Sequence, residues 1–217
     1  MPKFVDAALR RQEVVEAVFR IVAADGLERA SLREVADEAG LAVGSVRHYF
    51  ASSDELLAFS FGVVVDRIAG RLEAAEDRLA KAAPGSAEQH AGVIALLGEL
   101  LPLDEERAVD ACVWMAFKNA ARIKPFLAPE ADRSHRTVAA VVGRLIMELT
   151  AGPGTGALEQ QELVTEAERL LAILDGLAMH ALLQPEWMTA QMCHDVLEAH
   201  LASLGAGAAG NRRATGP

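Results

Sequence analysis

Residues 31–50 have the sequence SLREVADEAGLAVGSVRHYF, which predicts two short helices joined by a tight turn. Ser31 and Glu34 have the spacing of a capping box, an arrangement that starts a helix. Gly40 follows this helix and accepts the positive φ that a tight turn requires. A further short helix then reaches Phe50. Two short helices separated by a glycine turn form the helix-turn-helix arrangement.

The second of these helices has one apolar side and one open side. Val46 and Phe50 lie four residues apart, so both face the same way and can anchor the helix to a core. The other side chains are small or are of types that hydrogen-bond bases and phosphates, which suits contact with DNA and equally an ordinary solvated face. They are Val43, Gly44, Ser45, Arg47, His48 and Tyr49.

The rest of the chain is typical of consecutive amphipathic helices separated by Pro and Gly. One helix precedes the helix-turn-helix, a long one follows from about Ser52, and five more end near Leu204. Alanine, leucine and glutamate favour helix over strand, so we predict an all-α fold of about nine helices. The expected divisions are a helix-turn-helix domain at 1–52, a second helical domain at 53–204 and a disordered Gly/Ala-rich tail at 205–217.

The formal net charge of −10 is the main argument against a nucleic-acid partner. DNA affinity rests largely on Lys and Arg side chains that neutralise phosphates. The first 60 residues also carry more acidic than basic side chains. A DNA site must therefore be a local patch and not a charged domain.

The two cysteines, Cys112 and Cys193, form neither a disulfide framework nor a metal-binding spacing such as C-x2-C. No stretch approaches the ~18 apolar residues of a membrane span, and the N-terminus has no apolar run of signal-peptide length. We therefore expect a cytoplasmic protein with no membrane partner.

An enzyme built on a helical bundle is one alternative. A di-iron bundle needs Glu-x-x-His pairs on facing helices, and the sequence contains none. The sequence also lacks a G-x-S-x-G nucleophile elbow and a P-loop. We expect no catalytic residue, no metal, no cofactor and no enzymatic activity.

Residues 31–50, together with Asp54-Glu55-Leu56-Leu57, resemble the signature of the tetracycline-repressor (TetR) family. The likeness covers residues 10–57. Residues 170–178 and 196–201 more weakly resemble the betaine-responsive branch of that family. The resemblance implies a ligand-responsive, dimeric DNA-binding transcriptional regulator. It would be a repressor that leaves a pseudo-palindromic operator when a small, largely apolar molecule binds.

The resemblance also implies roles for single residues in binding double-stranded operator DNA. The start of the first short helix would hold a phosphate, since helix N-termini favour anions. The second short helix would enter the major groove. The implied contacts are Ser31 and Arg33 with a flanking phosphate, Tyr49 with another phosphate, and Ser45, Arg47 and His48 with the groove, beside Val43 and Gly44. Arg10 and Arg11 add backbone contacts.

Two positions depart from the family pattern. Ala42 stands where the family usually has a capping Ser or Thr, and Ser53 stands where it usually has a phosphate-binding Lys. Both changes lower the expected affinity for DNA. Ser53 and the net acidic N-terminal part motivate a second hypothesis, a helical ligand-binding or scaffold relative without operator binding. An activator with the same fold is a third.

By the same resemblance, residues 53–204 sense a small molecule and dimerise. Large, soft or aromatic side chains suit an adaptable apolar pocket, although such residues are also common in ordinary cores. The pocket candidates are Phe59, Phe61, Trp114, Phe117, Lys118, Met147, Asp175 and Met179.

The last two predicted helices each carry an apolar face, so two copies would form a symmetric four-helix interface. The residues expected in this homodimer interface are Leu170, Leu174, Leu177, Ala181, Leu182, Val196, His200 and Leu201. Such a dimer would place its two recognition helices on half-sites about 34–36 Å apart, or a multiple of that.

Overall fold

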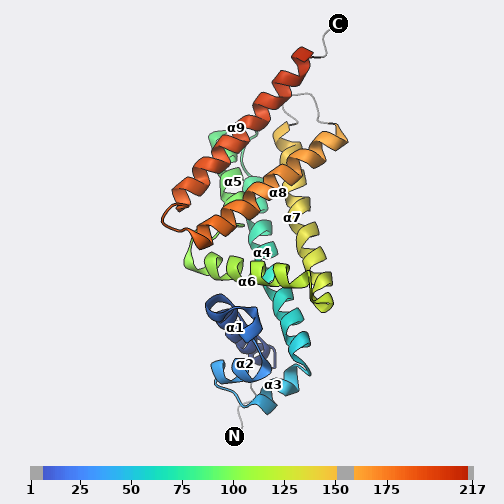
Figure 1. Ribbon diagram of the computed structural model, residues 1–217. Helices are drawn as coiled ribbons and strands as arrows, with labels where there is room; N and C mark the ends of the chain where they lie inside the picture. Colours follow the sequence, from blue (N-terminus) through green and yellow to red (C-terminus); the bar gives the residue numbers. More distant parts are fainter. Residues whose placement is uncertain (1–6, 151–158, 215–217) are drawn as a thin grey trace. The chain divides into compact units, whose positions relative to one another are not determined.

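The computed structural model describes residues 7–150 and 159–214, with side chains described up to Leu204. Its regular secondary structure in these ranges is entirely helical, which confirms the all-α prediction (Figure 1). None of the described helices has the length and hydropathy needed to cross a membrane. The helices are α1 (Ala7–Asp25), α2 (Leu32–Glu38), α3 (Val43–Tyr49), α4 (Ser53–Leu79), α5 (Ala87–Gly98), α6 (Glu105–Ala121), α7 (Ala128–Thr150), α8 (Gln160–Leu183) and α9 (Ala190–Ala214).

The helices form two compact units. The first unit contains Met1–Ile68 and Ala108–Ser134, and the second contains Ala69–Arg107 and His135–Pro217. Helices α4, α6 and α7 therefore each contribute to both units. The domain boundary predicted after residue 52 coincides with the start of α4, but the first unit continues into α4 as far as Ile68.

In the first unit, α1, α2 and α3 pack around a shared apolar core. Helix α1 buries Val18 and Phe19, α2 buries Val35 and Ala36, and α3 buries Val46. The small side chain of Ala36 is fully covered, so neighbouring helices approach this part of α2 closely. Burial of one such large side chain stabilises a fold by roughly 1.5–3 kcal/mol.

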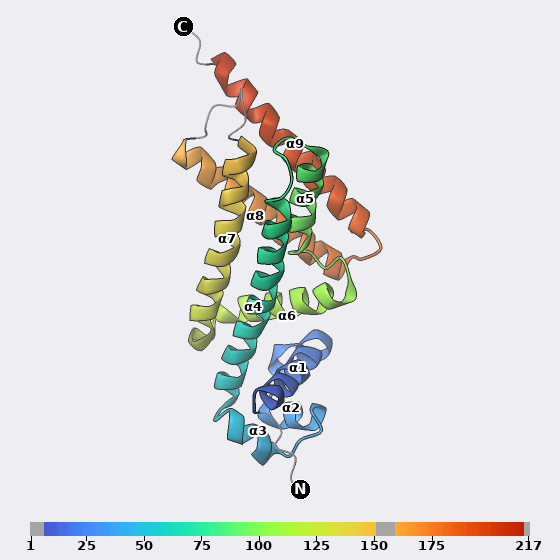
Figure 2. The same cartoon turned by 180° about the vertical axis from the view of Figure 1, so that it is seen from behind.

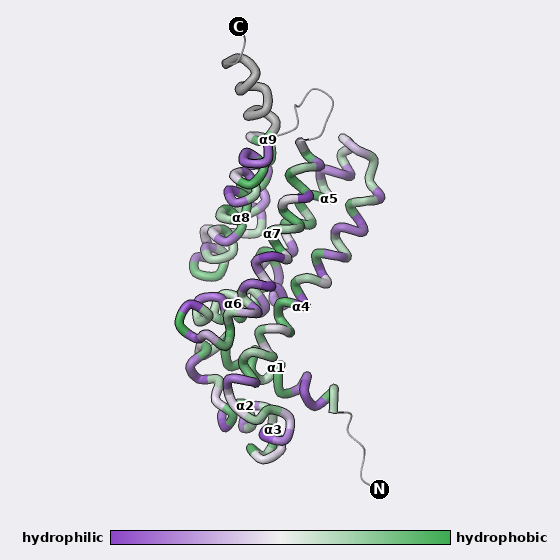
Figure 3. The backbone as a smooth tube through the Cα atoms, turned by 90° about the vertical axis from the view of Figure 1, so that its right-hand side faces the viewer, coloured by the Kyte–Doolittle hydropathy of each residue, from purple (hydrophilic) through white to green (hydrophobic). Residues whose placement is uncertain are grey.

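In the second unit, α9 packs against both α5 and α8 (Figure 2). Gly92 on α5 allows a close approach to the end of α4, since a Cβ there would lie 2.9 Å from Leu79 Cδ1. The core of this unit includes Leu72 of α4, Ile146 of α7 and Leu170 of α8. Hydrophobic and hydrophilic segments alternate along α4, as expected for a helix with one buried face (Figure 3).

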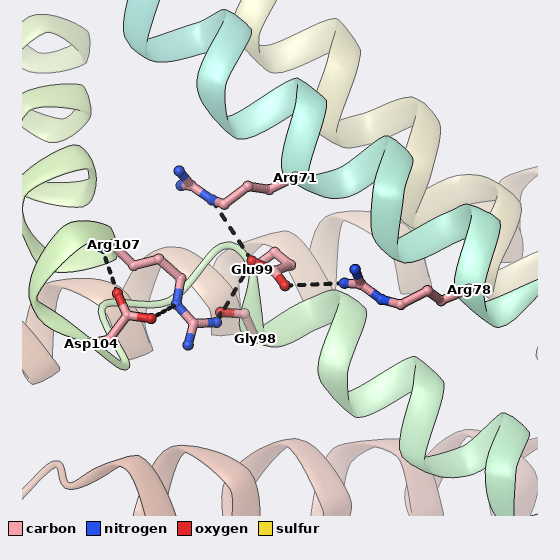
Figure 4. A network of polar contacts seen from close by, with 6 residues as sticks. All are labelled: Arg71, Arg78, Gly98, Glu99, Asp104 and Arg107. Atoms are coloured by element: carbon pink, nitrogen blue, oxygen red, sulfur yellow. Dashed lines mark hydrogen bonds and ion pairs between the residues drawn. The ribbon is translucent and has the colours of Figure 1, made fainter.

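A network of charged side chains joins α4 to the start of α6 within the second unit (Figure 4). The carboxylate of Glu99 lies 3.7 Å from Arg71, 3.4 Å from Arg78 and 3.7 Å from Arg107. Asp104 accepts hydrogen bonds from the backbone N–H and the guanidinium of Arg107, both at 2.8 Å. The backbone hydrogen bond is the main reason why the pKa of Asp104 lies below its usual value. Glu99 thus holds arginines from two helices at one point.

Helix α9 continues to Ala214, beyond the end predicted at Leu204. The predicted tail therefore starts with helical residues, and residues 215–217 lie outside the described part of the chain. Several alanines follow Leu204, and alanine has the highest intrinsic helix propensity.

Candidate functional site

The N-terminus of α2 has a side-chain cap at the position that the sequence indicates. Ser31 Oγ accepts a hydrogen bond of 3.2 Å from the backbone N–H of Glu34. The reciprocal half of the predicted capping box is replaced by other contacts. The backbone N–H of Ser31 donates to the carbonyl of Arg29 at 2.8 Å, and the Glu34 carboxylate lies 3.5 Å from the Arg29 guanidinium. The 3-10 turn at Leu27–Arg29 places these alternative partners close by.

The turn between α2 and α3 is built on Gly40, whose φ of 66° lies in the left-handed region. The N–H of Leu41 donates to the carbonyl of Ala36 at 2.8 Å, and the N–H of Gly40 donates to Asp37 at 3.2 Å. These two bonds form a Schellman motif, which satisfies carbonyls at the end of a helix. The turn therefore fixes where α3 begins.

Helix α3 has one buried side and one exposed side, as its sequence predicts. Val46 and Phe50, the residue that follows the helix, are both 0% exposed. The structure brings the predicted DNA-contacting residues of α3 to the other side. Gly44, Ser45, Arg47 and His48 are exposed there, whereas Val43 and Tyr49 are half-buried. Ser31 and Arg33, at the start of α2, are also exposed.

The two departures from the family pattern have clear structural positions. Ala42 is the N-cap of α3 and provides no side-chain hydrogen bond, so this helix begins without a cap of the kind found at α2. Ser53 is the first residue of α4. Ser52, which precedes it, accepts a 3.1 Å hydrogen bond from the N–H of Glu55, and the Glu55 carboxylate accepts one of 2.7 Å from the N–H of Ala51. The start of α4 is therefore well capped, but Ser53 provides no positive charge for a phosphate.

Arg11 of α1 connects the first helix to the end of α3. Its guanidinium donates a 3.3 Å hydrogen bond to the carbonyl of Tyr49. It also lies 5.4 Å from the centre of the Phe50 ring and 5.3 Å from that of Phe59. Both distances are within the range of cation–π attraction. Arg11 therefore holds the C-terminal end of α3 against α1 and α4.

A second arginine joins three helices of the first unit. Arg67 of α4 forms ion pairs with Glu16 of α1 and, at 3.5 Å, with Asp110 of α6. Its guanidinium lies 4.7 Å above the ring of Phe19. Asp110 is only 1% exposed, and the nearby guanidinium of Arg67 offsets part of the cost of burying its carboxylate. No sequence pattern indicated the cluster, because its members are separated by long stretches of chain.

The predicted pocket residues in the first unit have different environments. Phe61 and Phe117 are 0% exposed and stack on each other with ring centres 5.1 Å apart. Trp114 is half-buried; its indole N–H donates to Ser134 at 2.6 Å, and Lys118 Nζ lies 4.1 Å from the centre of its ring. Phe59 is 39% exposed and lines an open groove beside α3.

The other three pocket candidates belong to the second unit. Met147 of α7 and Met179 of α8 are 48% and 45% exposed, and Asp175 of α8 is exposed. These side chains therefore lie on the surface of their unit. The eight candidates do not form a single site within either unit, because each unit contains only part of the set.

The predicted interface residues divide into two groups. Leu170, Leu174, Leu177 and His200 are at most 5% exposed, so their own subunit already covers them. Ala181, Leu182, Val196 and Leu201 are half-buried. Other large apolar side chains on α8 and α9 are more accessible. They are Val164, Met179, Leu183 and Met192.

His200 is an unusual member of the buried group. Both of its ring nitrogens are buried without a hydrogen-bond partner among the residues whose side chains are described. Burial lowers the pKa of His200 below its ordinary value, and the nearby positive charge of Arg169 lowers it further. The uncharged imidazole is therefore the form that fits between α8 and α9.

Comparison with known proteins identifies relatives over nearly the whole chain. Residues 14–58 match the family described as bacterial regulatory proteins, tetR family, and residues 89–206 match the family described as BetI-type transcriptional repressor, C-terminal. The chain is 35% identical over 206 residues to the HTH-type transcriptional regulator PksA of Bacillus subtilis (strain 168), which covers 94% of each chain.

Two further matches agree with these. The HTH-type transcriptional regulator BetI of Escherichia coli O139:H28 is 25% identical over 198 residues, which cover 90% of this chain and 94% of BetI. The crystal structure of a transcriptional regulator from Rhodococcus sp. Rha1 aligns with a TM-score of 0.73 and 31% identity, covering 91% of this chain and 96% of the other. The matches span both the helix-turn-helix and the C-terminal helices.

Proposed function

We propose that the protein, which belongs to the TetR family of transcriptional regulators, represses transcription from an operator that α3 reads. The observation that carries this proposal is the division of α3 into a buried and an exposed side. Val46 and Phe50 fix the helix to the first unit, while Arg47 and His48 stay accessible. Exposed polar side chains on a fixed helix can enter a major groove together.

The exposed side chains fit distinct parts of a DNA duplex. An arginine such as Arg47 can bond O6 and N7 of guanine with two parallel N–H groups, which reads a base directly. The start of α2, with Ser31 as its cap, presents backbone N–H groups that favour a phosphate. The proposed contacts are Ser45, Arg47 and His48 to bases, Val43 and Gly44 beside them, and Ser31, Arg33 and Tyr49 to phosphates.

Two copies of the chain act together in this proposal. Helices α8 and α9 carry accessible apolar side chains, among them Val164, Leu183 and Met192. Their burial against the same surface of a second copy would form a symmetric four-helix interface. The two α3 helices would then lie on half-sites about 34–36 Å apart or a multiple of that, so the operator is a pseudo-palindrome.

A small, largely apolar molecule releases the repressor from its operator. It binds the C-terminal helical domain and favours a spacing of the two α3 helices that no longer fits DNA. A typical coupling of this kind is about 1–3 kcal/mol per site. The protein acts in the cytoplasm, where both the operator and the effector are present.

The test is binding of the purified protein to labelled DNA from the region upstream of its own coding sequence, at two salt concentrations, with random DNA as competitor. We expect retention that random DNA does not abolish and that weakens as salt rises, because phosphate contacts release counterions. Binding that random DNA removes completely would contradict the proposal.

A second candidate is a ligand-binding relative that does not bind an operator. The excess of acidic over basic side chains in the first 60 residues, and Ser53 where the family usually has a phosphate-binding lysine, favour it. It predicts no retention of any operator-length duplex at low salt, together with normal dimerisation. The same binding experiment therefore separates the two functions.

A further inference from the structure

The first unit contains an open groove of about 820 Å³ between α1, the end of α3 and α4. Figures 1 and 2 show these three elements side by side. The volume is in the range of small-molecule sites. Its walls include Arg11 and Val15 of α1, Tyr49 of α3, and Phe59 and Val63 of α4. All of these residues belong to one compact unit.

The apolar part of the groove is formed by flat and branched side chains. Val15 is completely covered, Val63 is half-buried, and the ring of Phe59 remains 39% exposed. An accessible aromatic ring next to aliphatic side chains fits another flat ring, since offset aromatic pairs gain stability beyond that of simple burial. The apolar surface therefore favours an aromatic ligand.

The polar part of the groove carries one positive charge that no carboxylate neutralises among the described residues. Arg67 is paired with Glu16 and Asp110, and Asp66 is paired with Arg133 at 2.6 Å. The contacts of Arg11 are the Tyr49 carbonyl and the rings of Phe50 and Phe59. Its guanidinium retains N–H donors that match a carboxylate in geometry and charge.

We infer that this groove binds a flat aromatic carboxylate, with its ring on Phe59 and Val63 and its carboxylate on Arg11. The ligand would act at the end of α3, because Arg11 also donates to the carbonyl of Tyr49. A carboxylate is a stronger acceptor than that neutral carbonyl, so the ligand competes for the Arg11 donor. Its negative charge would also oppose a phosphate near Tyr49. This last effect on DNA rests on the proposed function.

The binding test uses Tyr49, the single tyrosine of the chain. Protein grown with 3-fluorotyrosine carries one fluorine nucleus, at the edge of the groove, and 2-naphthoate is the probe. We expect a saturable shift of the fluorine resonance with 2-naphthoate and little response to the uncharged 2-naphthylmethanol. This comparison uses the unmodified sequence and needs no variant to fold.

Two variants assign the carboxylate to Arg11. Arg11→Gln should weaken binding of 2-naphthoate about tenfold or more, the effect of losing a charge-assisted hydrogen bond. Arg10→Gln removes the same charge from the neighbouring residue, which pairs with Glu13 and does not line the groove, so its affinity should match the parent. Equal affinities for all three proteins would overturn the assignment, as would calorimetric binding of 2-naphthoate without any shift of the Tyr49 signal.

The effect on DNA is measured separately. Saturating 2-naphthoate should weaken operator binding by the parent protein and leave the Arg11→Gln protein unaffected. A saturable fluorine shift with unchanged operator affinity would overturn the regulatory role while the binding site stands. Failure of the unliganded protein to bind any operator would instead contradict the proposed function.

Discussion

The α2–α3 segment and the α8–α9 pair both show apolar residues at helical spacing, but the partners that cover those residues differ. Val46 of α3 and Phe50, the residue that follows it, are covered by helices of the same small unit. In α8, Leu170 and Leu174 are covered in the same way, whereas Leu183 is 67% exposed on the same helix. Periodicity thus identifies a buried face and does not say whether the subunit or a second copy buries it.

The largest expected change in the free energy of unfolding comes from a substitution in the first unit. Phe50→Ala removes a ring that is 0% exposed and should lower the free energy of unfolding by about 3–5 kcal/mol. Phe59→Ala is the matched control, because that ring touches Phe50 but is 39% exposed. Urea unfolding measures both. Equal losses in the two variants would contradict the assigned core.

The next effect separates the two kinds of apolar residue on α8. Leu174→Ala should lower the free energy of unfolding by about 2–5 kcal/mol, because the subunit covers this side chain. Leu183→Glu should change subunit stability little and weaken dimerisation. Unfolding at fixed protein concentration and sedimentation equilibrium provide the two readouts. Dimer dissociation in Leu174→Ala without loss of subunit stability would reverse the assignment.

A pair of glycines tests the turn. Gly40→Ala should destabilise the protein by about 1–2 kcal/mol, since its φ of 66° is unfavourable for a residue with a Cβ. Gly44→Ala, in α3, should stabilise it by up to about 1 kcal/mol because alanine is the better helix former. A Cβ at either position would meet no atom within 4 Å, so neither substitution changes stability through a steric clash. Thermal unfolding should show a lower Tm for Gly40→Ala and a higher Tm for Gly44→Ala. Tm shifts of the same sign would contradict the role of the positive φ at Gly40.

Tyr49→Phe tests the proposed hydrogen bond between Tyr49 and a DNA phosphate. Loss of one hydroxyl hydrogen bond to a phosphate should weaken binding by about 1 kcal/mol on operator and random DNA alike. The unfolding transition should not change, because the ring is retained. Fluorescence anisotropy on both duplexes measures the effect, and a loss confined to the operator would assign Tyr49 to base reading.

The smallest expected effect is the contribution of the buried His200 of α9 to the pH dependence of folding stability. Its folded pKa is lowered, so the unfolded chain binds more protons below the ordinary histidine value of about 6.5. The stability of the folded state is then complete above that pH and is lost as pH falls towards the folded pKa. The contribution to the slope stays below about 1.4 kcal/mol per pH unit.

His200→Leu should remove this part of the pH dependence. His135→Leu, the same substitution at an exposed histidine, is the matched control. Urea unfolding at several pH values between about 5 and 8 makes the comparison. An identical slope in the parent and in His200→Leu would contradict an unpartnered buried imidazole.

The parts of the fold that the sequence predicts correctly depend on residues a few positions apart. The cap at Ser31, the turn at Gly40 and the buried pair Val46 and Phe50 are of this kind. The reciprocal cap by Glu34 fails because a neighbouring residue, Arg29, pairs with its carboxylate. Such competition depends on the path of the preceding 3-10 turn, which the spacing does not reveal.

The parts that escaped prediction depend on residues far apart in the chain. Phe61 of α4 stacks on Phe117 of α6, a contact that helical periodicity does not indicate. The arginine cluster at Arg67 and the groove at Arg11 each combine helices separated by tens of residues. The DNA contacts, the effector pocket and the dimer interface stay predictions.

The most direct test of the central claim, that the exposed side of α3 reads the operator, is a competition experiment with Arg47→Ala. The account predicts that this variant loses its preference for operator over random DNA, by about 1–3 kcal/mol, while Arg136→Ala on the exposed surface of α7 keeps it. An Arg47→Ala protein with the full preference of the parent would contradict the claim.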